Sequence, residues 1–388
     1  MAETGLPLGA VYTGATVQTL DQARKEAESK PEGYSPTAFN PKTCSQKGYC
    51  KVARTRVPVG GNKTPSPDAI AKGAKVPYEG EQDKDKRGFN VYYEVHGTGP
   101  NHVVFIMGLN NSCFGWLNQV EHLVKDPSFS CLVLDNRGYG NTDIPSGRYK
   151  TSEMALDVLE VCDHVGWTGL RDLNVVGVSM GGMISLEISK LAPERVKSLT
   201  LISTTSGRGN GEKDLRISLP PFTGVSTISR LIAGRTLGFD SDQYRVNRVC
   251  EMLFPTKFLE TVNENDPKKR TNRETFQEMF AFRYTFTRRQ TLYGALAQVR
   301  GVVTHRVSPS QLSRINEAIP KITIITGDDD NLVNPANSHH MKKHMPKADL
   351  HILPGVGHVT VVQEPEKVNA ILDDAFAVAS KRLQEGKW

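Results

Sequence analysis

Short runs of continuous apolar residues recur along this chain and constrain its fold more than any other feature. The runs occupy residues 102–107, 130–135, 173–178, 196–203, 321–326 and 350–354. Hydrophobicity that is continuous rather than alternating is typical of strands buried on both faces, as in a parallel sheet. The runs therefore predict a buried sheet of mostly parallel strands.

Helical patterns separate these runs. Apolar residues between 151 and 166 recur at 3.6-residue spacing, as on the buried face of a helix, and similar patterns occupy 180–192, 335–345 and 365–383. Residues 89–95 instead alternate apolar with polar residues, as a half-buried strand would. Strands that alternate with helices predict an α/β fold with a doubly wound, mostly parallel sheet.

The interval 205–318 interrupts this alternation. It contains no buried-strand run, only helical stretches rich in aromatic residues. Such an insertion between two core strands predicts a helical cap over the carboxyl edge of the sheet, where open α/β sheets bind ligands. The predicted core then has two parts, residues 88–204 and residues 319–388.

Residues 1–87 differ from the rest of the chain in composition. The stretch up to residue 86 contains eight of the 22 prolines, and it lacks sustained apolar periodicity. Only one short helix is expected there, over residues 17–30. We predict an N-terminal extension that is partly disordered or draped over the core, with no chemistry of its own.

The charge balance of the remaining chain excludes some classes of function. Residues 1–87 hold 14 of the 48 Lys and Arg residues and 10 of the 42 Asp and Glu residues, which leaves 34 and 32 for the rest. A nearly neutral domain argues against a nucleic-acid-binding face. No apolar run approaches the ~20 residues of a membrane-spanning helix, so we expect no stable membrane insertion. The first residues also lack the basic and apolar regions of a secretory signal.

The six cysteines are scattered and show no CxxC spacing. Cys44 and Cys50 are too far apart for a usual zinc half-site. His340 and His344 share a helix face, but no acidic third ligand lies on that predicted helix. We therefore expect no metal and no cofactor, and a reducing, cytoplasmic location.

One pentapeptide carries a chemical signal. Gly177-Val178-Ser179-Met180-Gly181 reads G-x-S-x-G between a predicted strand and a predicted helix. This is the setting of a nucleophile elbow, in which a sharp turn exposes a serine hydroxyl at the head of the sheet. Glycines on both sides allow strand and helix to approach closely. We predict Ser179 as the nucleophile.

A serine hydroxyl becomes a good nucleophile only beside a base that an acid orients. His358 follows the strand at 350–354 in a glycine-flanked turn and is the predicted base. The acid is one of Asp328, Asp329 and Asp330, which follow the strand at 321–326. Asp330 is preferred because the apolar pair Leu332-Val333 follows it and would fix the loop.

The negatively charged oxygen of an acyl-transfer intermediate needs two N–H donors. The backbone N–H of Met180, directly after the nucleophile, is one expected donor. The backbone N–H of Leu109, in the loop after the strand at 102–107, is the other. Gly108 beside it permits close approach of the backbone.

The motifs together resemble the α/β-hydrolase superfamily of lipase- and esterase-like enzymes with a helical cap. The matching segments, in order, are DNRGYGNTD (135–143), GVSMGGMISLEISKLAPERVKSLTLISTT (177–205), GDDDNLVNP (327–335) and PGVGHVTVVQEPEKV (354–368). Within that superfamily the chain is most similar to the 3-oxoadipate enol-lactonase-like hydrolases. The resemblance implies a Ser-Asp-His triad at Ser179, Asp330 and His358. One departure is Met107-Gly108, where His-Gly is frequent.

These features predict a serine hydrolase that cleaves a carboxylic ester or lactone of a small apolar molecule through an acyl-enzyme. Aromatic side chains of the predicted cap would roof an apolar pocket. An acyltransferase is one alternative, since His344 and Asp349 form an H-x-x-x-x-D pattern. Carbon–carbon bond hydrolases and cofactor-free haloperoxidases use similar triads. A receptor or scaffold without catalysis is the alternative from a different class. Acyl chain length and oligomeric state are left open.

Overall fold

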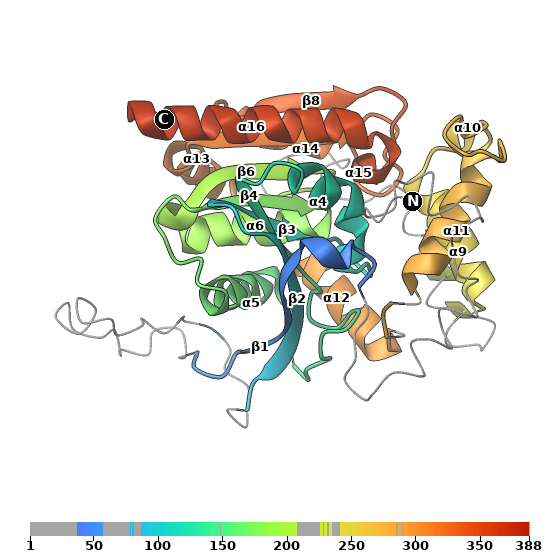
Figure 1. Cartoon of the computed structure of the whole chain (residues 1–388), viewed down its shortest axis with the longest axis horizontal. Helices are drawn as coiled ribbons and strands as arrows, with labels where there is room; N and C mark the ends of the chain where they lie inside the picture. The colour runs from blue at the N-terminus through green and yellow to red at the C-terminus, as the bar shows by residue number, and fades with distance from the viewer. Residues whose placement is uncertain are drawn as a thin grey trace.

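The computed structural model describes residues 37–56, 78, 80, 87–147, 149–207, 226–227, 229–230, 233–234, 241–284, 286–288 and 290–387 (Figure 1). The helix expected over residues 17–30 lies outside the described residues. No helix among the described residues is long and apolar enough to cross a lipid bilayer.

One eight-stranded sheet forms the centre of the molecule, in the order β1-β2-β4-β3-β5-β6-β7-β8. β2 runs antiparallel to both β1 and β4, and all other neighbours are parallel. The predicted α/β fold with a mostly parallel sheet is confirmed. The strands are β1 (Cys44–Val52), β2 (Phe89–Gly97), β3 (Asn101–Ile106), β4 (Phe129–Leu134), β5 (Leu173–Val178), β6 (Val196–Ile202), β7 (Lys321–Gly327) and β8 (Asp349–Leu353).

Helices cover both faces of this sheet, because successive strand residues point to opposite faces. On β3, Val104 and Ile106 join a core with α5, α6, α13 and α14, whereas Val103 and Phe105 join a core with α4 and α16. The short helices η1 (Pro41–Thr43) and η2 (Cys113–Trp116) precede β1 and α4. The covering helices are α4 (Leu117–Leu123), α5 (Thr151–His164), α6 (Met180–Leu191), α13 (Pro309–Ala318), α14 (Ala336–His344), α15 (Thr360–Gln363) and α16 (Pro365–Glu385).

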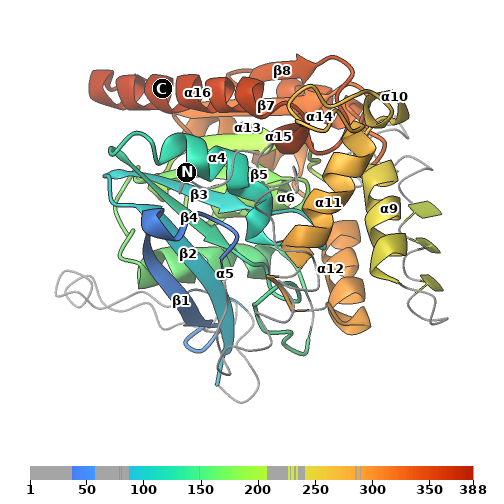
Figure 2. The same ribbon diagram turned by 45° about the vertical axis from the view of Figure 1, so that its right-hand side comes forward.

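Between β6 and β7 the chain forms further helices that stand at one side of the molecule (Figure 2). We call these the cap helices: α9 (Asp242–Leu253), α10 (Thr256–Leu259), α11 (Asn272–Tyr284) and α12 (Leu292–Thr304). α13 also falls inside the interval 205–318, but it packs against α6 and α14 in the core.

The strand β1 was not anticipated from the sequence. It pairs with β2 from Val52 opposite Phe89 to Cys44 opposite His96, and so adds an edge strand to the sheet. Only Cys50 and Val52 of this strand are buried, so its residues show little apolar pattern. We call residues 37–56 the N-terminal strap.

A buried cluster of charges anchors the end of the N-terminal strap to α5. The Arg56 guanidinium lies 3.1 Å from Glu153, 2.5 Å from Asp157 and 2.5 Å from Glu160, and only 1% of its side chain is exposed. Arg137 donates a second hydrogen bond of 2.6 Å to the Asp157 oxygen that pairs with Arg56. Each buried carboxylate is thus paired, as buried charges must be.

Candidate active site

Ser179 occupies the turn between β5 and α6 in a strained conformation, with φ 56° and ψ −120°. A Cβ atom at Gly177 would collide with the backbone of Gly181, and one at Gly181 would collide with the carbonyl of Ile106. The two glycines of the pentapeptide are therefore required by the close approach of strand and helix. Strain of this kind costs on the order of 1–3 kcal/mol and is concentrated at functional sites.

The structure brings His358 and Asp330 together. His358 Nδ1 lies 2.8 Å from Asp330 Oδ2, and both side chains are almost fully buried. The other oxygen, Asp330 Oδ1, accepts hydrogen bonds of 2.8 Å from the backbone N–H groups of Leu332 and Val333. These bonds fix the carboxylate so that it faces the imidazole.

The two neighbouring acids have other roles. Asp328 and Asp329 are exposed, whereas only 6% of Asp330 is exposed. Asp328 Oδ1 accepts a hydrogen bond of 2.7 Å from Gly355 N–H and so closes the loop that leads to His358. Of the three candidates, Asp330 is the one that contacts His358.

Ser179 and His358 line the same cavity, of about 120 Å³. Ser179 follows β5 and His358 follows β8, so both lie at the carboxyl edge of the parallel strands. Ser179 Oγ makes no hydrogen bond to His358 or to any other described residue. Serine–base hydrogen bonds are often long without substrate and tighten only when substrate binds.

The loop after β3 closes the cavity beside Ser179. A Cβ atom on Gly108 would lie 3.0 Å from Ser179 Cβ and 3.6 Å from Ser179 Oγ, so this backbone passes directly over the nucleophile. Within the described chain, the N–H groups of Leu109 and Met180 donate no hydrogen bond. Both donors predicted from the sequence therefore lie beside Ser179 with their hydrogens unused.

Polar side chains distant in sequence hold this loop. Asn136 Nδ2 donates a hydrogen bond of 2.8 Å to the Met107 carbonyl. Gln298 of α12, fully buried, accepts from the Asn110 N–H at 3.0 Å and donates to the Arg137 carbonyl at 2.8 Å. Asn136 lies in the motif 135–143, but Gln298 carries no sequence signal, because it acts through a contact between distant segments.

Asp135 holds the far end of the same loop. Its two carboxylate oxygens accept hydrogen bonds of 2.8 Å from the N–H groups of Cys113 and Asn141. Burial raises the pKa of Asp135 to about 6, and these hydrogen bonds only partly oppose that effect. The segment 135–143 therefore acts as a structural turn that supports the loop after β3.

The cap helices form the opposite wall of the cavity. Val249, Met252, Phe280 and Tyr284 line it, from α9 and α11, together with the cationic side chain of Arg245. Other cap aromatics pack against each other, with ring centroids 4.8 Å apart for Phe254 and Phe276, 5.6 Å for Phe254 and Phe258, and 5.7 Å for Phe258 and Phe276. Only some of the cap aromatics therefore face the cavity.

The cap also contacts the loop that carries His358. The backbone N–H of His358 donates a hydrogen bond of 2.9 Å to the carbonyl of Leu253, the last residue of α9. A Cβ atom on Gly357 would lie 2.5 Å from the same carbonyl, so only glycine fits there. Cap and base are thus joined through the backbone.

Other candidates from the sequence lie elsewhere. His344 ends α14 and Asp349 begins β8, where it pairs with Lys321. His340 and His344 have ring centroids 4.8 Å apart, on α14. None of these residues lines the cavity that holds Ser179. Among the described residues, the one group arranged to bind a metal is Cys44, Glu94 and His96, also outside that cavity.

Comparison with known proteins places the chain in a family. The sequence model of the alpha/beta hydrolase fold matches residues 101–365. The chain belongs to the α/β-hydrolase family. The fold class and superfamily predicted from the sequence are confirmed, as is the prediction of an enzyme of this family.

Several α/β-hydrolases resemble this chain over most of its length. "Putative carbamate hydrolase RutD" of Stutzerimonas stutzeri (strain A1501) is 26% identical over 297 residues, which cover 74% of this chain and 97% of that protein. The enol-lactonase from Burkholderia xenovorans LB400 aligns with a TM-score of 0.57 and 19% identity, over 74% of this chain and 97% of its own. The esterase EaEST from Exiguobacterium antarcticum aligns with a TM-score of 0.59 and 19% identity, over 76% and 98%.

Proposed function

We propose that this α/β-hydrolase cleaves a carboxylic ester or lactone of a small, largely apolar molecule through an acyl-enzyme on Ser179. Asp330 and His358 would complete the triad. The observation that carries the proposal is the 2.8 Å contact between His358 Nδ1 and Asp330 Oδ2, with His358 and Ser179 lining one cavity.

The arrangement supports a sequence of proton transfers. Asp330 accepts the hydrogen on His358 Nδ1, so His358 Nε2 is the free base in the neutral imidazole. A rotation of the Ser179 side chain toward Nε2 would pass the hydroxyl proton to His358 as Oγ attacks the substrate carbonyl. His358 then returns the proton to the leaving oxygen, and water releases the acyl group by the reverse sequence.

The backbone donors support the same chemistry. Attack on a carbonyl makes a tetrahedral oxyanion, which the unused N–H groups of Leu109 and Met180 would stabilise. The carbamate hydrolase, lactonase and esterase names of the similar proteins all describe cleavage at an acyl carbon. A triad with two N–H donors suits that class of reaction.

The cavity supports a small substrate. Its volume of about 120 Å³ and its aliphatic and aromatic walls favour a short apolar acyl group. We infer no nucleic-acid partner, and a cytoplasmic location, which is supported by six free cysteines.

A fluorophosphonate probe tests the activated serine. Wild-type protein should be labelled once, and Ser179→Ala should abolish labelling. Ser189→Ala is the matched control, because Ser189 also lies on this strand–helix unit but donates its hydroxyl hydrogen to the Ser185 carbonyl. Unlabelled wild-type protein would favour a receptor or scaffold instead.

Turnover of p-nitrophenyl esters of graded chain length, and of lactones, tests the substrate class. We expect the highest kcat/KM with short acyl chains, and His358→Ala should lower kcat by about 10⁴- to 10⁶-fold because triad members act as a unit. His351→Ala, on the neighbouring strand β8, is the control. Near-normal turnover by His358→Ala would contradict the mechanism.

A further inference from the structure

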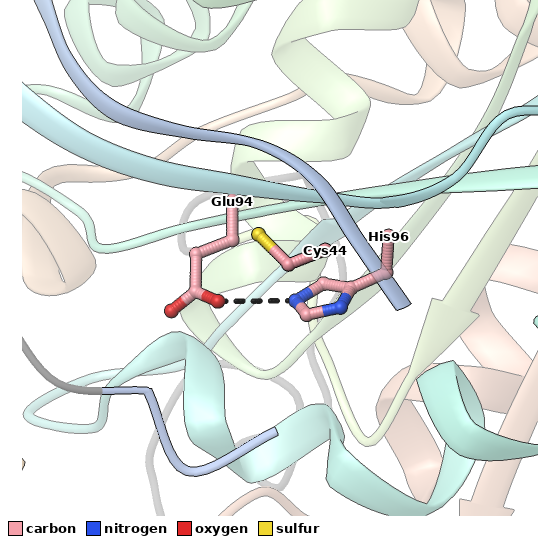
Figure 3. A group of neighbouring side chains, drawn as sticks. All are labelled: Cys44, Glu94 and His96. Carbon is pink, nitrogen blue, oxygen red and sulfur yellow. Dashed lines mark hydrogen bonds and ion pairs between the residues drawn. The ribbon is translucent and has the colours of Figure 1, made fainter. Parts of the chain in front are cut away.

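A second group of reactive side chains lies where the N-terminal strap meets the sheet. Cys44 begins β1, and Glu94 and His96 lie on β2, with Cys44 paired opposite His96 (Figure 3). The thiol, one carboxylate oxygen and one ring nitrogen all lie within 4.8 Å of one another. Glu94 and His96 are fully buried, whereas Cys44 is only half-buried.

Glu94 accepts hydrogen bonds from two hydroxyl groups. Tyr92 OH donates to Oε1 at 2.5 Å, and Thr37 Oγ1 donates to Oε2 at 2.7 Å. A carboxylate that accepts at both oxygens is held as an anion. Its remaining contact, at 3.1 Å, joins Oε2 to His96 Nε2.

The other ring nitrogen of His96 also has a polar partner. Thr43 Oγ1 lies 2.8 Å from His96 Nδ1 and 2.9 Å from the Asn40 carbonyl, so its single hydrogen serves one of the two. When that hydrogen goes to the Asn40 carbonyl, Nδ1 carries the hydrogen of the neutral imidazole and Nε2 presents a lone pair. That lone pair then faces the Glu94 carboxylate 3.1 Å away, as two ligands of one cation would.

We propose that Cys44, Glu94 and His96 bind a divalent metal ion of borderline softness, with Zn²⁺ as the best match. Thiolate, imidazole and carboxylate are the ligands that Zn²⁺ takes, whereas Mg²⁺ prefers oxygen alone. The contacts of Thr43 to His96 and of Tyr92 to Glu94 are the outer-shell bonds that orient metal ligands. A water molecule that reaches the ion from the solvent side of the half-buried Cys44 would be the fourth ligand.

Such an ion would link the N-terminal strap to β2. Cys44 follows η1 directly, and its strand is the edge of the sheet. The site is separate from the cavity that holds Ser179 and takes no part in the proposed hydrolysis. Its role is to fasten an edge strand that buries few apolar residues.

Alkylation of the wild-type protein tests the site without any substitution. Cys44 is the one cysteine of the six that is not buried, so iodoacetamide should modify it alone in the native protein. One equivalent of Zn²⁺ should suppress this reaction, and Mg²⁺ should not. Modification that Zn²⁺ leaves unchanged would mean that a proton bridges Glu94 and His96, and the metal site would be wrong.

Variants test which side chains bind the ion. Co²⁺ should give a thiolate-to-metal absorption band that Cys44→Ser abolishes, whereas Cys50→Ser, a buried cysteine of the same strand, should retain it. Thr43→Val removes the outer-shell contact to His96, together with the Thr43 hydrogen bond to the Asn40 carbonyl, and should weaken Zn²⁺ binding by roughly 10- to 100-fold. Equal Zn²⁺ affinity in wild type, Cys44→Ser and Thr43→Val, measured by calorimetry, would overturn the proposal.

Discussion

The turn at Ser179 and the N-terminal strap differ in what holds them. The turn is determined locally, by glycines that leave no room for a side chain between β5 and α6. The strap is held by distant partners, since Arg56 pairs with three carboxylates on α5 that lie 97 to 104 residues away. Changes near the turn should therefore act mainly on turnover, and changes in the strap mainly on stability.

Of the four substitutions that compare the two regions, Asp330→Asn should have the largest effect, and that effect should fall on turnover. An amide in place of the carboxylate would no longer accept the His358 Nδ1 hydrogen properly, which favours the wrong tautomer, and kcat should fall by about 10⁴-fold. The urea unfolding midpoint should change little, since Leu332 and Val333 can still donate to the amide oxygen. If the fall in kcat were matched by a fall in the urea unfolding midpoint, the expected separation of turnover from stability would be contradicted.

Arg56→Met should show the opposite behaviour. It leaves Glu153, Asp157 and Glu160 with fewer partners in a buried cluster, and such losses cost about 3–5 kcal/mol of unfolding free energy. The kcat of the folded fraction should stay within about twofold. Arg54→Met, at an exposed position two residues earlier, should change stability by less than about 0.5 kcal/mol. Equal stability of the two variants in urea would refute a dominant role for the buried cluster.

The Asp135 carboxyl should make the stability of the protein depend on pH. Its pKa is about 6 in the folded protein, above the ordinary unfolded value near 4, so the folded state binds this proton more tightly. Stability through this group is therefore full below about pH 4 and is lost as pH rises through 6. Relative to Asp135→Asn, the wild type should gain about 2–3 kcal/mol between pH 7 and pH 4 in urea unfolding. Parallel pH curves for the two proteins would contradict the raised pKa.

Gln298→Ala should have the smallest effect of the four substitutions, and it should lower both stability and turnover. It removes the partners of the Asn110 N–H and the Arg137 carbonyl, at a cost of about 1–3 kcal/mol. Since Asn110 follows Leu109 directly, part of this cost should appear as an approximately tenfold lower kcat. Arg300→Ala, at an exposed position of α12, is the control and should leave ester turnover unchanged.

The sequence predicted the parts of the molecule that local patterns determine. Continuous apolar runs predict the buried strands, and the glycines around Ser179 predict the sharp turn that this residue occupies. The apolar pair Leu332-Val333 favours Asp330 as the acid in the sequence. In the structure, the backbone N–H groups of that pair donate hydrogen bonds to the Asp330 carboxylate. Because the residues that hold Asp330 follow it directly in the chain, a short stretch of sequence was enough to favour this acid.

Other features left no such trace. β1 buries only Cys50 and Val52, so its sequence lacks an apolar pattern and resembles that of a linker. Glu94 and His96 occupy positions in a strand that reads as half-buried, and only the paired strand brings Cys44 beside them. Contacts between distant segments, such as that of Gln298 with the loop after β3, depend on the assembled fold and cannot be read from a single stretch of sequence.

The hydrogen bond from His358 to the Leu253 carbonyl has a consequence for how a molecule could reach the nucleophile. If α9 swings outward to admit a ligand, this bond must break, and the imidazole loses one of the restraints that set its direction. In an open protein His358 and Asp330 would therefore be less well aligned for proton transfer. The alignment would return only when α9 closes over the bound ligand. Water that enters the open cavity without a ligand would therefore meet a His358 side chain that is not aligned to act as a base.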